Sequence, residues 1–181
     1  GQAITVAYTD TTKTDGAVTI AADASAKDIA AALSTIDGVD AGATTSVTFS
    51  NIDDAQASDV VSFDLVSYSD ASGDSQSTTV SIAGDADAAT VNTNFDTAMD
   101  TAVAGINSLH GDNDLSYDSE TNTLLSASGR NIAIDGFADD NGSGGTNTEA
   151  SMTVSSPNTG AGILLDDVTA NTDTVITGTV T

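Results

Sequence analysis

The sequence of 181 residues contains no cysteine and no tryptophan, a single proline and a single histidine. Without cysteine the chain can form neither a disulfide framework nor a thiolate metal site. No apolar run approaches the roughly 20 residues that a membrane-spanning helix needs. We recognise no secretory signal peptide at the start, and from the abrupt first and last residues, Gly1 and Thr181, we expect a piece excised from a longer protein.

Basic residues are equally scarce. Only three Lys and Arg residues stand against 27 Asp and Glu residues, which gives a formal net charge of −24. Such a chain repels nucleic acid and anionic membrane surfaces, so we expect neither as a partner. The acidity indicates a well-hydrated surface suited to a saline exterior, where salt screens the self-repulsion. Cation binding is the alternative interpretation and is taken up below.

The sequence offers no catalytic constellation. Ser–His–Asp chemistry would need His110 beside a serine that nothing in the sequence marks. His110 instead adjoins Gly111 at the end of a predicted helix, where an imidazolium interacts favourably with the helix dipole. No glycine-rich phosphate loop followed by lysine occurs, and no zinc-ligand spacing. Arg130 is expected to pair with nearby aspartates on the surface. We therefore expect a non-enzymatic protein without a cofactor.

Composition alone leaves disorder open, because Ile, Leu, Val and Phe make up only about a fifth of the residues and the net charge is high. Periodicity decides against disorder, since a disordered chain has no reason to sort its apolar residues by face. The sequence therefore predicts a folded chain whose core is built partly from alanine.

Residues 17–49 have the pattern of a strand–helix–strand unit. Apolar and polar residues alternate at positions 18–20, as in a half-buried strand. Ser25 and Asp28 have the spacing of a capping box at a helix start. The apolar stripe that follows consists of Ile29, Ala32, Leu33 and Ile36. Gly38 ends the predicted helix, and alternation resumes at residues 47–49.

Residues 78–137 repeat the unit with a longer helix. A strand at residues 79–82 precedes Asp85 and Asp87, either of which can cap the helix. The predicted apolar stripe is Val91, Phe95, Ala98, Met99, Ala102, Val103, Ile106 and Leu109. Gly111 ends the helix. The elements that follow are strands at 115–118 and 123–125, a tight turn at 128–130 and a strand at 131–134.

These two units, which cover over half the chain, resemble a known family. The Ser-Ala-Lys-Asp-Ile-Ala-Ala-Ala-Leu helix at residues 25–33, after the Val-Thr-Ile strand at 18–20, closely resembles the flagellin insertion motif. That motif occurs in the variable, outward-facing domains of bacterial flagellins. The second unit is similar to the same pattern, in which an aromatic strand, an Asn-rich turn and a Gly-Arg-x-Ile segment follow the helix. Two copies in tandem strengthen the resemblance.

The fold class that we expect is α+β, with two small subdomains that each pack a helix on a mainly antiparallel β-sheet. Residues 1–70 form the first, to which 148–181 return, and 71–147 form the second. Flagellin variable domains are inserted as one continuous loop, so the resemblance implies ends that emerge close together, by pairing a strand near Ile4 with one near Val175. Residues 138–145 are predicted to be a tip loop or a hinge.

Calcium is the one metal that the sequence suggests. Asp112, Asp114, Asp118 and Glu120 alternate with other residues, superficially as in a loop that wraps Ca²⁺. Tyr117 stands where such a loop needs glycine, however, and a strand with a polar outer face produces the same alternation. We regard these four residues as weak candidates and expect no metal site.

The resemblance implies a structural, surface-exposed variable domain of a flagellin subunit, extracellular and displayed on the bacterial flagellum. The helices that build a flagellin filament core are absent, so its partners would be neighbouring flagellin subunits, contacted through core domains outside this sequence. O-linked glycans on its many hydroxyl side chains are a second candidate partner. No functional residue of the family can be carried over. The alternatives are a calcium-dependent adhesin or surface-layer module and the outer domain of a hook–filament junction protein.

Overall fold

The computed structural model describes residues 1–10, 12, 14–53, 57, 59–68, 74–140, 150–157, 160–166 and 172–181. These residues form an α+β fold of two helices and twelve strands, which confirms the predicted fold class. The helices are α1 (Ala26–Leu33) and α2 (Ala88–His110). The strands are β1 (Gln2–Val6), β2 (Gly16–Ile20), β3 (Ala43–Asp53), β4 (Val60–Tyr68), β5 (Ser75–Ala83), β6 (Leu115–Asp118), β7 (Thr123–Ser126), β8 (Ile132–Asp140), β9 (Ser151–Ser155), β10 (Ile163–Asp166), β11 (Thr174–Ile176) and β12 (Thr179–Val180).

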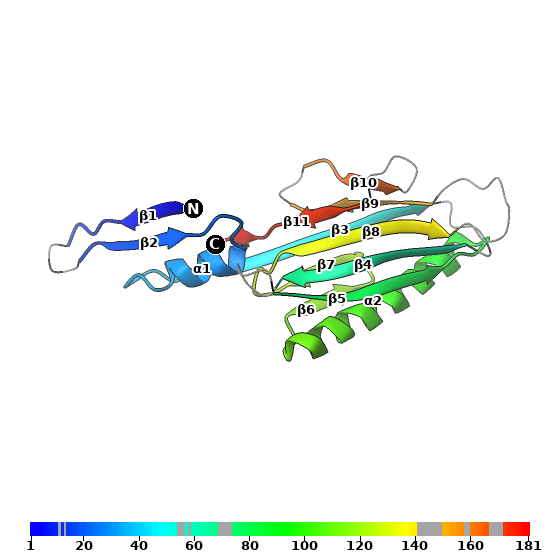
Figure 1. Cartoon of the computed structure of the whole chain (residues 1–181), viewed down its shortest axis with the longest axis horizontal. Coiled ribbons are helices and arrows are strands. Elements are labelled where there is room, and N and C mark those ends of the chain that lie inside the picture. The colour runs from blue at the N-terminus through cyan, green and yellow to red at the C-terminus, as the bar shows by residue number, and fades with distance from the viewer. Residues whose placement is uncertain are drawn as a thin grey trace.

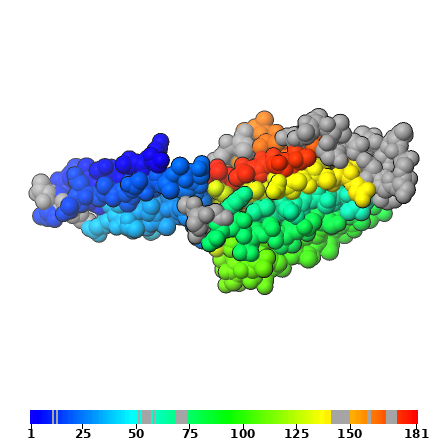
Figure 2. Space-filling model, in the orientation of Figure 1, coloured from blue at the N-terminus to red at the C-terminus, as the bar shows by residue number. Residues whose placement is uncertain are grey.

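The molecule is elongated, with a narrow arm and a wider body (Figures 1 and 2). The arm consists of the β1–β2 hairpin and α1. The body contains two antiparallel sheets, one with the strand order β10-β9-β3-β7-β6 and one with the order β11-β8-β4-β5. β12 pairs with β3 and brings the C-terminal strand to the place where arm and body meet.

Helix α2 covers the side of the body where the two sheets end in β5 and β6, and it contacts both edge strands. Its buried stripe includes Val91, Phe95, Met99 and Ile106, as the spacing predicts. The prediction was wrong for Leu109, which is exposed near the end of the helix. Asp87 is the N-cap and accepts a hydrogen bond from the Ala89 amide. Gly111 ends the helix with φ +73°, a left-handed conformation that glycine adopts without a steric penalty. The helix therefore begins and ends on residues that the sequence marks.

The core of the body is built around phenylalanine. All four phenylalanines of the chain are at most 1% exposed. Phe49 of β3 stacks on Phe63 of β4 at 6.5 Å between ring centroids, and it meets Phe95 of α2 edge-on at 5.5 Å. Phe137 extends the row on one side of Phe63, and Tyr117 on the other side of Phe95. This aromatic row joins both sheets to α2.

The arm has a small core of its own. The capping box predicted at the start of α1 is present, since Ser25 accepts from the Asp28 amide and Asp28 accepts from the Ser25 amide. Ile36 is buried against Gly16, where a Cβ atom would lie 2.3 Å from the Ile36 Cγ2 atom. At the tip of the arm, the Tyr8 hydroxyl donates to the Asp37 carbonyl. Hairpin and helix are thus held face to face along the arm.

One predicted strand pairing is wrong. Ile4 lies opposite Val18 in the β1–β2 hairpin, and Val175 lies opposite Ala133 of β8. The hairpin forms because a short loop costs little closure entropy and brings two strands with matching apolar faces onto α1. The C-terminal end lies at the waist, the place where arm and body meet, and there Thr181 and Gly42 exchange two backbone hydrogen bonds of 2.8 and 2.9 Å.

The predicted boundary between residues 70 and 71 falls between β4 and β5. All nine positions of β4 pair with β5, and β4 also pairs with β8. One hydrophobic cluster contains side chains from both body sheets and from α2. Strand pairing therefore runs across that boundary, and the part that stands apart is the arm. The predicted tip loop or hinge at 138–145 lies outside the described residues from position 141 on, and 138–140 belong to β8.

Replacing Phe49 by alanine should destabilise the chain by about 3–5 kcal/mol, because it opens a cavity between both sheets and α2. The measurement is urea unfolding followed by circular dichroism. Leu109→Ala is the matched control, since Leu109 is 58% exposed and should shift the unfolding free energy by less than about 0.5 kcal/mol. Similar losses in the two variants would contradict the position of Phe49 at the centre of the core.

Candidate functional site

Residues 112–120, in which carboxylates alternate with other side chains, follow the end of α2 and include the strand β6. Asp112 follows the Gly111 cap, and Asp114 immediately precedes β6. Within β6, Leu115 is buried and Asp118 is exposed, as a strand with one polar face requires. The Asp118 carboxylate accepts the Glu120 amide at 2.9 Å and so closes the turn after the strand.

Three of the four weak metal candidates, Asp112, Asp114 and Asp118, have carboxylates that contact protein groups. Asp112 and Asp114 both point at Arg130, whereas Asp118 and Glu120 belong to the turn after β6. Across the part of the chain that the structure describes, no group of three or more His, Asp or Glu side chains is placed to hold a metal ion.

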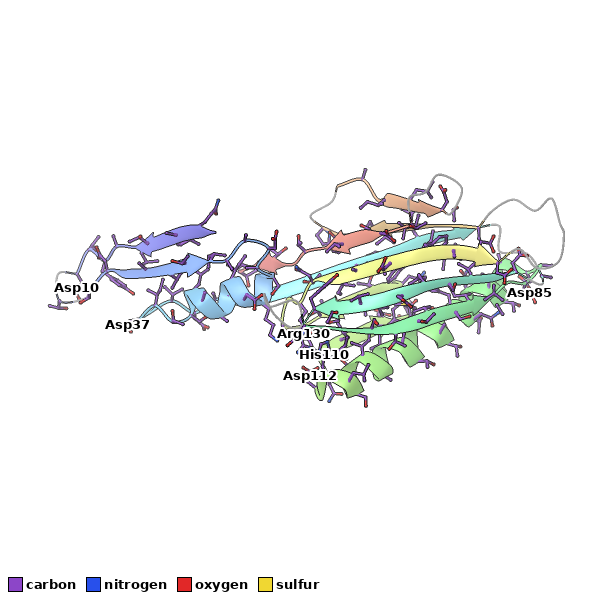
Figure 3. The ribbon with its side chains drawn as sticks, viewed as in Figure 1. Asp10, Asp37, Asp85, His110, Asp112 and Arg130 are labelled. Atoms are coloured by element: carbon purple, nitrogen blue, oxygen red, sulfur yellow. The ribbon has the colours of Figure 1, made fainter. Side chains whose placement is uncertain are left out.

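The Arg130 side chain is the centre of a buried polar cluster. The guanidinium Nη2 atom lies 2.7 Å from the Asp112 Oδ2 atom, and Nη1 lies 3.7 Å from the Asp114 Oδ2 atom. The expected pairing with aspartates is present, but the expected surface location is wrong, because Arg130 is only 6% exposed. Two carboxylates compensate the cost of burying the guanidinium. We call His110, Asp112, Asp114, Ser126, Ser128 and Arg130 the polar junction; Figure 3 labels His110, Asp112 and Arg130.

Asp114 organises this junction. Its carboxylate accepts the Ser126 hydroxyl at 2.6 Å and the Ser128 amide at 2.7 Å. The Ser126 hydroxyl oxygen in turn accepts the Arg130 amide at 2.9 Å. The turn between β7 and β8 is therefore tied to the segment between α2 and β6, which places the guanidinium between two carboxylates.

Gly129 fits this turn against the start of β3. It has φ +79°, and a Cβ atom there would lie 2.5 Å from the Ala43 Cβ atom. Its carbonyl accepts the amide of Lys27, in the first turn of α1, at 3.1 Å. The junction thus lies at the waist and connects the arm to the body. The Ser-Gly-Arg sequence predicted the turn. The burial of Arg130 could not be predicted in the same way, because it depends on pairing with two aspartates that lie 16 and 18 positions earlier in the sequence.

His110 lies beside Arg130 and Asp112 at the end of α2 (Figure 3). Its ring donates to the backbone carbonyl of Ser67. Burial, and then the positive charge of Arg130, lower the pKa of the imidazole below its usual value. A neutral imidazole held by a backbone carbonyl fits a structural contact at the helix end.

A second carboxylate group lies on the outer face of the β11-β8-β4-β5 sheet. Asp173 shares a hydrogen bond with Asp135, and that bond together with the negative charge of Asp173 raises the Asp135 pKa. The Asp173 pKa is lowered, because its carboxylate accepts the Gly136 amide at 2.8 Å. Asp64 adds further negative charge nearby and accepts the Thr79 hydroxyl at 2.6 Å. This face is therefore an acidic, exposed surface.

The groove between β5 and α2 has a volume of about 410 Å³. The hydroxyls of Thr97 and Thr101 donate to carbonyls one turn earlier in α2, at 2.9 and 2.8 Å. The Asn94 amide donates to the Ala83 carbonyl at 2.8 Å. Since these polar groups satisfy the protein's own backbone, the groove brings together no nucleophile and base.

Comparison with protein-family models gives no match. Searches of curated proteins and of solved structures give no match either. Over the described residues, neither helix combines the length and the apolar character that crossing a bilayer would require.

Asp112→Asn should lower the unfolding free energy at pH 7 by at most about 1 kcal/mol, because Asp112 is partly exposed and its ion pair is solvent-screened. Arg130 holds the folded-state pKa of Asp112 below the unfolded value of about 3.9. This stabilisation is therefore present above about pH 4 and is lost as the pH falls through the lower folded-state pKa.

The measurement is the unfolding free energy of both proteins from pH 7 to pH 2. Asp40→Asn, at an exposed position, is the control for the general loss of one negative charge. A difference between Asp112→Asn and the native chain that does not change with pH would contradict the ion-pair explanation.

Proposed function

We propose that this chain is a structural, non-enzymatic domain displayed on the outside of a bacterial flagellar filament, as the variable region of a flagellin subunit. One observation carries the proposal: His110 and Arg130 are committed to an internal structural junction, while aspartates and hydroxyl side chains cover the outside. Such a surface suits display in a saline exterior better than binding of an anionic substrate.

The distribution of charge supports an exposed location along the whole length of the molecule. Asp10 and Asp37 lie toward the far end of the arm, and Asp85 lies at the opposite end of the body (Figure 3). With a net charge of −24, neighbouring copies repel one another unless salt screens them. A dense array of such domains would remain hydrated and separate.

The two local units that carry the resemblance to flagellins support the same proposal. The Ser25–Asp28 capping box starts α1, and the Gly129-Arg130 turn starts the path into β8. Both meet at the waist through the bond from the Lys27 amide to the Gly129 carbonyl. The similar sequence units thus form adjoining parts of one fold.

The proposal also has a geometric requirement, namely that two connections to a filament core leave the domain near each other. In the view of Figure 1 the marks for the N- and C-terminal ends lie near each other where the arm meets the body, which is compatible with this requirement. The partners would then be neighbouring flagellin subunits, contacted through core domains outside this sequence. O-linked glycans could be attached to the exposed hydroxyls, since about a quarter of the residues are Ser or Thr.

Two other functions fit the resemblance or the acidity. The outer domain of a hook–filament junction protein has the same architectural requirements. A calcium-dependent adhesin or surface-layer module is favoured by the exposed carboxylates around Asp135.

Calcium chloride should raise the melting temperature no more than magnesium chloride at equal concentration, because both ions then act by screening repulsion between carboxylates. Thermal unfolding in matched series of the two salts and of sodium chloride at equal ionic strength measures the effect. A rise specific to calcium would favour the adhesin over the flagellar domain.

Immunogold electron microscopy of the source cells, with antibody raised against this chain, tests the proposed location. We expect gold along the whole length of a thin helical filament. Antibody preabsorbed with the purified chain is the control and should leave the filaments bare. Gold on the cell body, or only at the base of the filament, would overturn the proposal in favour of an adhesin or a junction protein.

A further inference from the structure

The arm and the body have separate cores. Four apolar side chains are buried in the arm, namely Ile20, Ala26, Ala30 and Ile36. None of these four belongs to the hydrophobic cluster that fills the body. Burial of apolar surface is the main force that holds packed elements together, and here it acts within each part rather than between them. Other contacts must therefore set the orientation of the arm on the body.

The chain crosses from the arm into the body at Gly42. The β1–β2 hairpin and α1 precede this residue in the sequence, and all strands of the two body sheets follow it, beginning with β3. Glycine restricts the backbone less than any other residue. A single strand that crosses between two separately packed parts at a glycine has the geometry of a hinge.

The C-terminal strand converts this crossing into a two-stranded ribbon. β12 pairs with Ala43 and Thr44 of β3, and Thr181 exchanges its two backbone hydrogen bonds with Gly42. The pairing of β3 with the body sheet begins one residue later, since Thr45 is the first position that pairs with β7. β12 therefore covers the part of β3 that lies ahead of the body sheet, and the ladder of the body does not depend on it. We call residues 178–181 the strap.

The strap also packs against the helix of the arm. α1 contacts both β12 and β3. A Cβ atom on Gly178 would lie 2.6 Å from the Thr44 carbonyl oxygen and 2.9 Å from the Ala26 Cβ atom. It would lie 2.3 Å from the Thr45 Oγ1 atom, and Thr45 is only 1% exposed. Gly178 thus fills the space between the first residue of α1 and the start of β3, and a larger residue would push them apart.

A further contact joins α1 to the body. The Lys27 amide donates to the Gly129 carbonyl at 3.1 Å. One hydrogen bond fixes a distance, but the helix can pivot about it. The strap, in contrast, contacts α1 and pairs with β3 at the same time, so it determines the angle between the two.

We propose that residues 178–181 are a releasable strap, which fixes the orientation of the arm and whose release lets the arm turn about Gly42 while both parts keep their folds. Figure 1 shows the strapped state. Segments with few buried apolar contacts open before the core of a protein does, and the strap is such a segment. The proposal rests on the contacts at the waist and does not depend on the proposed function.

Because the chain has no cysteine, spin labels can be attached at chosen positions to measure the arm orientation. Ala31→Cys on α1 and Ala104→Cys on α2 are exposed positions, and double electron–electron resonance gives the distance between their labels. We expect one narrow distance distribution in the otherwise native chain. Gly178→Val should broaden it, since the valine side chain does not fit between Thr44 and Ala26. A distribution that stays equally narrow in Gly178→Val would overturn the proposal.

A second pair of labels within the body is the control. Ala104→Cys on α2 and Leu164→Cys on β10 are both exposed and both lie in the body. Their distance distribution should stay narrow in Gly178→Val. Broadening of this pair would also overturn the proposal, because the strap would then support the fold of the body itself.

A disulfide that locks the strap provides the converse test. Thr44 and Thr179 lie opposite each other in the β3–β12 pair, and both are exposed. They are two positions from Gly42 and Thr181, which exchange both backbone bonds, so they form a pair of the same kind. Cα atoms in such pairs are about 5.5 Å apart, which is within the range that a disulfide bridges.

The readout is hydrogen exchange of the Lys27 amide in the full-length Thr44→Cys/Thr179→Cys chain, because its bond to Gly129 breaks when the arm turns. Oxidation should slow this exchange by about tenfold or more relative to the reduced form, which is the matched control. Amides of β4, in the middle of the body, should exchange equally in both forms. Equal exchange of the Lys27 amide in the two forms would contradict a releasable strap.

Discussion

The fold depends above all on contacts between phenylalanine rings. The chain is rich in alanine, serine and threonine, and its few large side chains have to fill the body. Phe49 lies at the centre, because it contacts a ring from the second sheet and a ring from α2. Aromatic pairs in such geometries stabilise by more than their buried area alone. Aliphatic side chains of the same cluster, among them Leu65, Ile82 and Ile106, pack around this row.

Tyr117 extends the aromatic row to the protein surface. Its ring packs edge-on against Phe95, while its hydroxyl lies 2.8 Å from a carboxylate oxygen of Asp96. Burial, and then the bond to Asp96, raise the pKa of this hydroxyl, so it remains a donor. One end of the core is thus closed by a side chain that is apolar inward and polar outward.

Charge imposes the second constraint. With 27 acidic residues, folding brings many carboxylates closer together and so opposes compaction. The structure places its single arginine inside, between Asp112 and Asp114, and exposes most aspartates. Arg130 connects two segments of the chain. Its guanidinium pairs with Asp112 and Asp114 before β6, and its amide donates to the Ser126 hydroxyl at the end of β7.

Local patterns in the sequence predicted most of the local structure, although α1 ends at Leu33 and not at the predicted stop, Gly38. The capping box at Ser25, the apolar stripe of α2 and its end at Gly111 all follow from residues a few positions apart. Long-range pairing was harder, because the alternation around Ile4 fits several neighbouring strands equally well. The hairpin with Val18 was therefore missed.

The candidate site shows the same limit. Of the alternating carboxylates from Asp112 to Glu120, only Asp118 lies in a strand, since β6 spans Leu115–Asp118 with Leu115 buried. That Arg130 is buried could not be deduced from its neighbours, because the aspartates that compensate its charge lie on a segment before β6. A charged residue is buried through its partners in space, which a local pattern does not contain.

The burial of Arg130 and of every phenylalanine also bears on digestion by proteases. Trypsin-like enzymes cleave after lysine or arginine, and this chain offers three such positions. Lys13 lies outside the described residues, Lys27 is in the first turn of α1, and Arg130 is sealed in the waist. Enzymes that cleave after phenylalanine meet the same obstacle, since a bond inside the body becomes accessible only when the body opens. The rate of cleavage at Arg130 would therefore report how often the body unfolds. In the presence of proteases, the lifetime of the chain would be set by the stability of its core.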